Sequence, residues 1–271
     1  MLRKRNGFTL MELLIVVAIL ALLAAVAIPR LIDVFERSRS GVQSYNLADA
    51  ARMIETYYGV NKKYPDGWDS LIDETSGTIY ANIHPNLAAL LVPVTLEDDP
   101  ATTIALDQKV SLNEAGIGHI FQHDATAGVV PSDSGTFRHH LGTGTGHDGT
   151  TNVVTLTGID TTAGSSGYNF LVNDLGLAPN NSTTLLTNNK FVVFGFGPKN
   201  TAVQSVVQQA PFLDQDKAST RYSRMLAVFM VPISGGGKAR LVGVLGPDGR
   251  GLADSIRDYN TDPQTTAPSH N

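Results

Sequence analysis

The residue of this sequence with the clearest chemical demand is one carboxylate, Glu12, near the start of an apolar run that ends at Ile28. A charge in a membrane-bound helix costs about 2.5–3.5 kcal/mol on insertion scales, so it needs a partner. The best candidate is a new α-amino group, made by cutting the chain after Gly7 and belonging to Phe8 of a neighbouring copy. This reading makes Glu12 an assembly residue and not a catalytic one.

A second group of carboxylates follows the last apolar strand expected in the chain. An Asp-Gly turn at Asp248 is followed by Asp254 and Asp258. Carboxylate oxygens on a flexible loop are the ligands that calcium prefers, although the spacing is not that of an EF-hand. The alternative is an Asp-Gly turn surrounded by solvated charges.

Histidines form the third group. His119 and His123 are four residues apart and would share one face of a helix, while His139, His140 and His147-Asp148 follow in a Gly-rich segment. Imidazoles at such spacing can bind zinc or a related metal, but the sequence has no His-Glu-x-x-His motif. Hydrogen-bonded or solvated surface histidines are the alternative.

The signatures of common enzymes are missing from the sequence. It has no complete P-loop, no Gly-x-Ser-x-Gly elbow and no cysteine. We therefore expect the protein not to be an enzyme, and a membrane-tethered enzyme that uses the histidines is a remote alternative.

These groups must be positioned by a long N-terminal helix and a folded head. Helical spacing of apolar residues continues from Phe8 to Tyr58, a length of 51 residues or about 77 Å. One domain cannot bury such a helix, so its N-terminal half must be covered by a membrane or by other subunits. Pro29 predicts a kink or a locally melted stretch, and Gly59 predicts the end of the helix.

Three interpretations compete for the N-terminal segment. In a secretory signal peptide, Leu13–Ala24 would be the apolar region and Ala25-Val26-Ala27 the cleavage site. In a simple membrane anchor, Leu13–Ile28 gives 16 uncharged residues, against roughly 20 needed for a span. The signal-peptide interpretation leaves Glu12 unexplained. The basic residues Arg3, Lys4 and Arg5 place the N-terminus on the cytoplasmic side in all three cases.

The third interpretation is a family resemblance. The segment Gly7-Phe8-Thr9-Leu10-Met11-Glu12, with Leu13–Ile28 and Pro29 after it, resembles the signal of type IV pilins and type II secretion pseudopilins. The resemblance implies that a prepilin peptidase cuts between Gly7 and Phe8 and methylates Phe8. It also implies that residues 8–28 rest in the inner membrane and later form the core of a filament, in which Glu12 pairs with the amine of an adjacent subunit.

Two further segments resemble the major pseudopilin of type II secretion. One is Asn61-Lys62-Lys63-Tyr64-Pro65-Asp66-Gly67-Trp68, which has the residues of a turn. The other is the loop after Leu245, which is similar to a C-terminal calcium loop. This similarity implies calcium at Asp248, Asp254 and Asp258.

The expected fold is α+β, a pilin-like lollipop in which the long helix packs on a head with an antiparallel sheet. The expected organisation is a leader at 1–7, the helix at 8–59, a head at 60–259 with an insert at about 73–188, and a flexible tail at 260–271. Short helices are expected at 85–91, 111–122 and 201–209. Strands are expected at 153–157, 191–194, 225–233 and 239–245, the last two as a hairpin.

Composition limits the partners. The chain has 271 residues and, after loss of the leader, 17 basic and 25 acidic residues remain, a formal charge of −8. A phosphate backbone is therefore an unlikely partner, and nucleic acid binding is not expected. Without cysteines, the head must be stabilised by packing or by a metal.

The sequence thus predicts a structural subunit of a type IV pilus-like or type II secretion pseudopilus filament. The precursor would lie in the bacterial inner membrane with its N-terminus in the cytoplasm, and the assembled filament would be periplasmic or on the cell surface. Expected partners are the prepilin peptidase, the inner-membrane assembly platform, other pilins and copies of the same chain. The alternative is a minor or tip pilin whose 73–188 insert binds a surface or a substrate.

Overall fold

The computed structural model describes a long helix and most of the head. The described residues are 9–97, 106–124, 130–131, 133, 135, 137–141, 150–156, 170–177, 188–213, 217–233, 237–254 and 256. The predicted leader, the predicted tail at 260–271, Gly7 and Phe8 lie outside these ranges.

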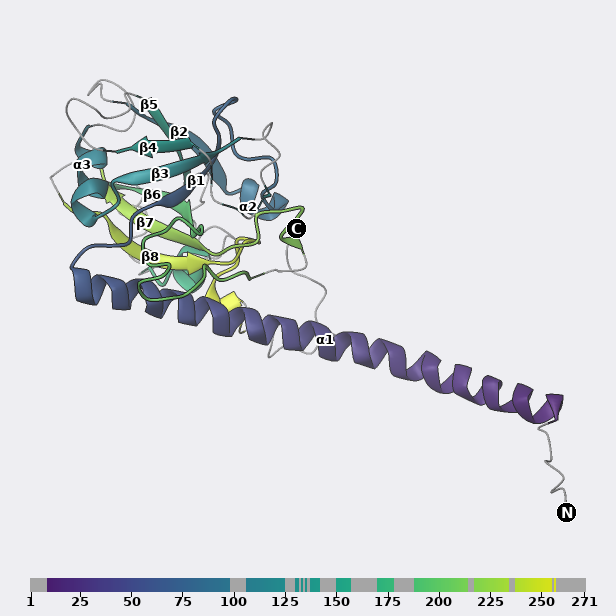
Figure 1. Cartoon of the computed structure of the whole chain (residues 1–271). Helices are drawn as coiled ribbons and strands as arrows, with labels where there is room; N and C mark the ends of the chain where they lie inside the picture. Colours follow the sequence, from purple (N-terminus) through teal and green to yellow (C-terminus); the bar gives the residue numbers. More distant parts are fainter. Residues whose placement is uncertain are drawn as a thin grey trace, which may run out of the picture.

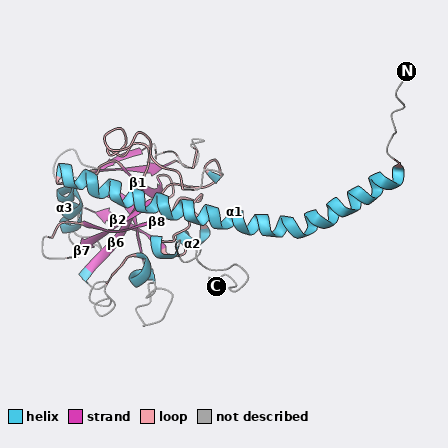
Figure 2. Ribbon diagram, turned by 90° about the horizontal axis from the view of Figure 1, so that it is seen from below, coloured by secondary structure: helices cyan, strands magenta, loops and turns pink. Residues whose placement is uncertain are grey.

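The predicted long helix is present as α1, Leu10–Asn61, with Thr9 as its N-cap. It ends two residues later than the expected stop at Gly59, because Lys62 adopts the left-handed conformation (φ 56°) and its N–H donates to the Tyr58 carbonyl at 2.8 Å. The helix is continuous through Pro29, so local melting at that residue is not present in the single chain. Its protruding part is curved and not sharply broken (Figure 2).

Eight strands form one sheet in the order β2-β5-β6-β1-β3-β4, and β7 joins it by pairing with β6 and β8. The strand bounds are β1 Trp68–Asp73, β2 Leu91–Glu97, β3 His119–His123, β4 Phe137–His140, β5 Thr150–Leu156, β6 Asn189–Gly195, β7 Leu226–Pro232 and β8 Arg240–Leu245. The expected hairpin is confirmed as β7 and β8, which are antiparallel. The expected antiparallel sheet is present in part, because the described strands pair antiparallel except for β1 and β3, which are parallel. The chain between them crosses over through α2, β2 and α3, which parallel pairing requires.

Both faces of the sheet are buried, which explains the continuous apolar runs in its central strands. Along β6, Val192 and Phe194 face one core, whereas Phe191 and Val193 face the other. Successive side chains of a strand point to opposite faces, so a strand buried on both sides needs apolar residues at every position. The C-terminal part of α1 covers the first face (Figure 1). Its buried residues in that core are Leu47, Ala50, Met53 and Ile54.

The short elements agree only in part with expectation. Helix α2, Pro85–Ala88, begins with proline as predicted. Helix α3, Leu106–Ala115, ends seven residues before the predicted Gln122, and β3 follows directly. Gly116 has φ +112°, and a Cβ there would lie 2.6 Å from the Tyr64 carbonyl oxygen. This close approach ends the helix and lets the chain pair with β1, so the expected helix at 111–122 is wrong beyond Ala115.

Two other loop regions differ from expectation or add to it. Residues 201–209 form successive turns and not the expected helix, with a bridge between Val203 and Val207. A π-helical turn, Phe170–Asp174, packs under the second face of the sheet. Residues 73–188, expected as an insert, contain β2, β3, β4 and β5 and are therefore part of the same sheet.

The overall arrangement is α+β, as predicted. The N-terminal half of α1 projects far from the head and has no other described segment beside it (Figure 1). Within the part of the chain that the structure describes, no helix reaches the combination of length and apolar character needed to cross a membrane.

Candidate functional site

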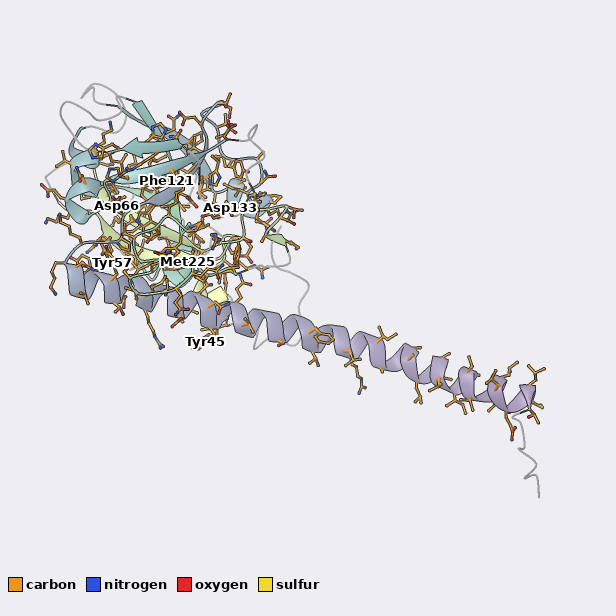
Figure 3. The ribbon with its side chains drawn as sticks, viewed as in Figure 1. Tyr45, Tyr57, Asp66, Phe121, Asp133 and Met225 are labelled. Carbon is orange, nitrogen blue, oxygen red and sulfur yellow. The ribbon has the colours of Figure 1, made fainter. Side chains whose placement is uncertain are left out.

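The projecting half of α1 is covered with exposed apolar side chains, which point outward all around the helix (Figure 3). Every large hydrophobic residue of this surface whose exposure is described is at least half exposed. Monomeric soluble proteins rarely expose contiguous apolar patches larger than a few hundred Å², so this surface indicates an interaction site. We call it the stalk surface; it consists of Leu10, Met11, Leu13, Leu14, Ile15, Val16, Val17, Ile19, Leu20, Leu22, Leu23, Ile28, Leu31, Val34 and Phe35.

Glu12 is held at the tip of this surface by a capping box. The Thr9 backbone N–H donates to Glu12 Oε2 at 2.9 Å, and the Thr9 hydroxyl donates to the same oxygen at 3.0 Å. In return, the Glu12 N–H donates to Thr9 Oγ1 at 3.3 Å. The sequence analysis missed this arrangement, although Thr-x-x-Glu before an apolar run is its usual signature. Glu12 therefore has a partner within its own chain before any second copy arrives.

Three other residues, Gly7, Phe8 and Pro29, are predicted to act with Glu12 in processing and assembly, and the structure describes only the last of them. Gly7 and Phe8 lie outside the described residues. Pro29 belongs to α1, whose helical backbone is uninterrupted at that residue. The structure of the single chain therefore presents Glu12 and the stalk surface together, on one projecting element.

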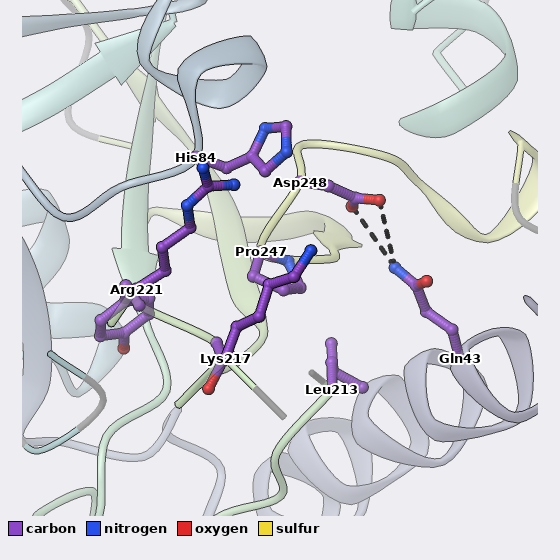
Figure 4. A pocket seen from close by; sticks show the side chains of 9 residues that line it. Gln43, His84, Leu213, Lys217, Arg221, Pro247 and Asp248 are labelled. Atoms are coloured by element: carbon purple, nitrogen blue, oxygen red, sulfur yellow. Dashed lines mark hydrogen bonds between the residues drawn. The ribbon is translucent and has the colours of Figure 1, made fainter. Parts of the chain in front are cut away.

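The predicted Asp-Gly turn is present after β8. Gly249 has φ +84°, where glycine is favoured, and its N–H donates to the Gly246 carbonyl at 3.0 Å. Both carboxylate oxygens of Asp248 lie 3.4 Å from Nε2 of Gln43, which is on α1 (Figure 4). It also accepts from the Arg250 N–H at 3.2 Å. The turn thus connects the C-terminal hairpin to the helix.

Positive charges surround this turn. A small pocket beside Asp248 is lined by the side chains of His84, Lys217 and Arg221 (Figure 4). Burial lowers the pKa of His84, the Asp248 charge opposes this, and Arg221, Lys217 and Arg250 lower the pKa further. The pocket therefore contains more cationic than anionic side chains.

The three predicted calcium ligands are not brought together among the described residues. Asp254 follows the turn in a short helical segment, and Asp258 lies outside the described part of the chain. Within that part, no group of three or more carboxylate or imidazole residues is arranged to hold a metal ion. Calcium at Asp248, Asp254 and Asp258 stays a prediction.

The predicted helix face of His119 and His123 is wrong, because both residues lie on strand β3. His119 Nδ1 lies 2.6 Å from Asp66 Oδ2, and its ring centroid is 4.7 Å from that of His140 on β4. His139 turns elsewhere, with Nε2 at 2.8 Å from Glu74 Oε2. His147 and Asp148 lie outside the described residues.

His123 is a buried core residue. Its ring stacks on Tyr80 at 4.4 Å between centroids and meets the edge of Tyr222 at 5.9 Å. Burial lowers the pKa of His123 to about 4, partly offset by the Asp73 charge, so the ring is neutral near pH 7. It supports the packing of the head.

Comparisons with known proteins agree with the site at the N-terminus. The family model described as "Prokaryotic N-terminal methylation motif" matches residues 2–28. The chain is 40% identical over 82 residues to the "Type IV wide pilus major component PilA4" of Thermus thermophilus, which covers 30% of this chain and 63% of that protein. It is 38% identical over 63 residues to the "Type IV major pilin protein PilA" of Myxococcus xanthus, covering 23% of this chain and 29% of that protein.

The chain thus spans less than two thirds of the length of either relative. No solved structure gives a significant match. The matched motif contains Glu12 and most of the stalk surface, and both relatives are pilins. The N-terminal segment of this chain thus matches the prepilin-type methylation motif, and the chain is similar to two type IV pilus proteins.

Proposed function

We propose that the protein is a structural subunit of a type IV pilus-like filament, assembled through the stalk surface of α1. The observation on which this rests most is that the motif-bearing half of α1 projects from the head with its large apolar side chains exposed. Burying apolar area against copies of the same helix would gain roughly 25 cal/mol per Å². A filament covers such a surface in every subunit except those at its ends.

Processing would come before assembly. The proposal includes cleavage between Gly7 and Phe8 by a prepilin peptidase, methylation of the Phe8 amine, and pairing of that amine with Glu12 of an adjacent subunit. Until then the precursor would be held in the inner membrane by Phe8–Ile28, a run of 21 residues with one charge, from which the assembly platform would take it. The support is the matched motif and the order of these residues in the sequence.

The printed names of both relatives refer to pilus components, which favours a pilus over a secretion pseudopilus. A specific observation also favours a second candidate, a minor or tip pilin with a binding head. The match to the Thermus pilin covers only 30% of this chain, so most of the head has no counterpart in that alignment. Abundance separates the two, because a main subunit must dominate the mass of sheared filaments.

The test is to shear filaments from the producing cells, image them by electron microscopy and identify their subunits by mass spectrometry. The expected result is filaments in which this chain is a major component, with an intact mass that lacks residues 1–7 and includes one methyl group. Gly7→Leu should prevent the mass change and the filaments together. A mature chain that starts at Ile28 would refute the proposal and indicate a secreted protein.

A further inference from the structure

Beyond filament assembly, the head brings the imidazole rings of His119 and His140 together. The two residues are direct partners in the antiparallel pairing of β3 and β4. The next pair along the two strands, Gly118 and Leu141, is hydrogen-bonded, because the Leu141 N–H donates to the Gly118 carbonyl at 2.8 Å. His119 and His140 therefore form the non-hydrogen-bonded type of pair, in which facing side chains approach most closely.

The separation of the rings suits a shared cation. Their centroids are 4.7 Å apart and their planes are tilted by 40°, so they are not simply stacked face to face. A zinc ion bound to two imidazoles at about 2.0–2.1 Å per Zn–N bond would place the two centroids about 5 Å apart. Both side chains are only partly buried, and that of His119 is 28% exposed, so an ion can reach them.

Asp66 fixes His119 in the form that binds a metal. Its Oδ1 accepts from the N–H groups of Gly118 at 2.9 Å and His119 at 2.7 Å, which holds the carboxylate in place. Its Oδ2 lies 2.6 Å from His119 Nδ1, and an ionised carboxylate can only accept. A neutral His119 ring that donates from Nδ1 to Asp66 has its lone pair on Nε2. A carboxylate behind a ligating histidine is the usual outer arrangement of zinc sites.

We propose that His119 and His140 bind one Zn²⁺ ion or a similar borderline divalent cation, with Asp66 as the outer partner of His119 and water in the remaining positions. The site lies on the head near the C-terminal end of α1, where Asp66 is labelled (Figure 3). Binding ties edge strand β4 to β3 and to the loop between α1 and β1. In a chain without cysteines, it provides a cross-link that a disulfide provides in other exported domains.

The experiment titrates Zn²⁺ into the full-length chain in detergent micelles and follows binding by isothermal calorimetry. One saturable site per chain is expected for Zn²⁺ and no heat from Mg²⁺, because imidazole nitrogens do not suit a hard cation. His119→Gln and His140→Gln should each weaken Zn²⁺ binding at least tenfold. His139→Gln is the matched control on the same strand, since His139 faces Glu74, and its affinity should stay within twofold of the wild type.

Asp66→Asn tests the outer partner with the loop preserved. Asparagine keeps an oxygen for the Gly118 and His119 N–H groups, but its NH₂ cannot accept from Nδ1. The proton then moves to Nε2 and removes the lone pair, so Zn²⁺ affinity should fall about 10–100-fold. Melting temperatures without metal would show that each variant is folded.

Three results would overturn the inference: no saturable Zn²⁺ binding by the wild type, wild-type affinity in both histidine variants, or an equal loss in His139→Gln. None of them bears on filament formation, so the site can fail while the proposed pilin function stands.

Discussion

The side chain of Gln43, in the middle of α1, lies 3.4 Å from both carboxylate oxygens of Asp248, which is 205 residues away in the chain. This contact attaches the turn after β8 to the helix at the point where α1 leaves the head. The Arg250 guanidinium, 3.9 Å from the same carboxylate, adds an attraction that solvent weakens. The turn predicted as a calcium loop is therefore also a joint between the head and the stalk.

A measurement in calcium can separate the predicted role of Asp248 as a calcium ligand from its contact with Gln43. A cation at Asp248 would have to displace the Gln43 amide group or rotate it so that its oxygen faces the metal. If calcium binds, the melting temperature of the chain should be higher in calcium than in a chelator. At a hundredfold excess over Kd, the gain is about 2.7 kcal/mol.

Two variants of Asp248 distinguish binding from the joint itself. Asp248→Asn keeps an oxygen for Gln43 but removes the charge, so it should abolish the calcium effect and leave stability in the chelator nearly unchanged. Asp248→Ala should lower stability in both conditions. Equal melting temperatures of the wild type in calcium and in chelator would mean that Asp248 acts only through its contact with Gln43.

Glu12 caps α1 and has a proposed role in assembly, and one substitution can separate the two. Glutamine at this position still accepts from Thr9, so Glu12→Gln keeps the capping box but removes the charge. We expect a processed, stable chain that forms few filaments, because the proposed pairing with an amine needs the charge. Thr9→Ala should instead cost about 1 kcal/mol at the helix end only. Wild-type filament yield from Glu12→Gln, measured by shearing and microscopy, would contradict the charge pairing.

Stability of the head should fall in weakly acidic solution because of His123. The folded-state pKa is about 4, below the ordinary value of 6.5, so the unfolded chain binds the proton more readily. The contribution is complete above about pH 6.5 and is lost as the pH falls towards 4, by about 3 kcal/mol in total.

Thermal unfolding between pH 4 and 7 measures this effect. His123→Phe keeps an aromatic ring against Tyr80 and should flatten the pH dependence. An unchanged slope in His123→Phe would assign the acid sensitivity to other groups.

The hydrogen bond from the Tyr222 hydroxyl to Asp69 Oδ2, 2.8 Å long, lies in the second core. Burial raises the pKa of Tyr222 well above its usual value, and the Asp69 charge adds to this, so the phenol stays a donor at any ordinary pH. Tyr222→Phe removes a donor to a buried charge and should destabilise the head by about 1.5–3 kcal/mol in denaturant unfolding. A loss below 0.5 kcal/mol would show that other groups satisfy Asp69.

Attachment of α1 to the head depends on a few buried residues. Leu47 is 1% exposed in the first core, whereas Tyr45, two positions earlier, is 70% exposed. Leu47→Ala should therefore cost about 2–5 kcal/mol, and Tyr45→Ala should change stability by less than about 0.5 kcal/mol. The same denaturant series checks both variants, and similar losses would mean that Tyr45 is covered in solution.

The sequence by itself determined the elements with strong local signals. The apolar period of α1, the proline that begins α2, the continuous apolar runs of β6 and β7 and the Asp-Gly turn at Asp248 all depend on neighbouring residues. The motif around Glu12 is equally local, which is why the resemblance to pilins can be read from some thirty residues.

Tertiary structure decided what local patterns could not. Residues 116–122 read as a helix, but Gly116 approaches the Tyr64 carbonyl too closely for a side chain, and pairing with β1 makes the segment a strand. That change of element moved His119 away from the predicted face shared with His123 and brought it beside His140 and Asp66. Residues 53 positions apart meet there because a parallel strand pair places them together, and no pattern within either segment specifies that contact.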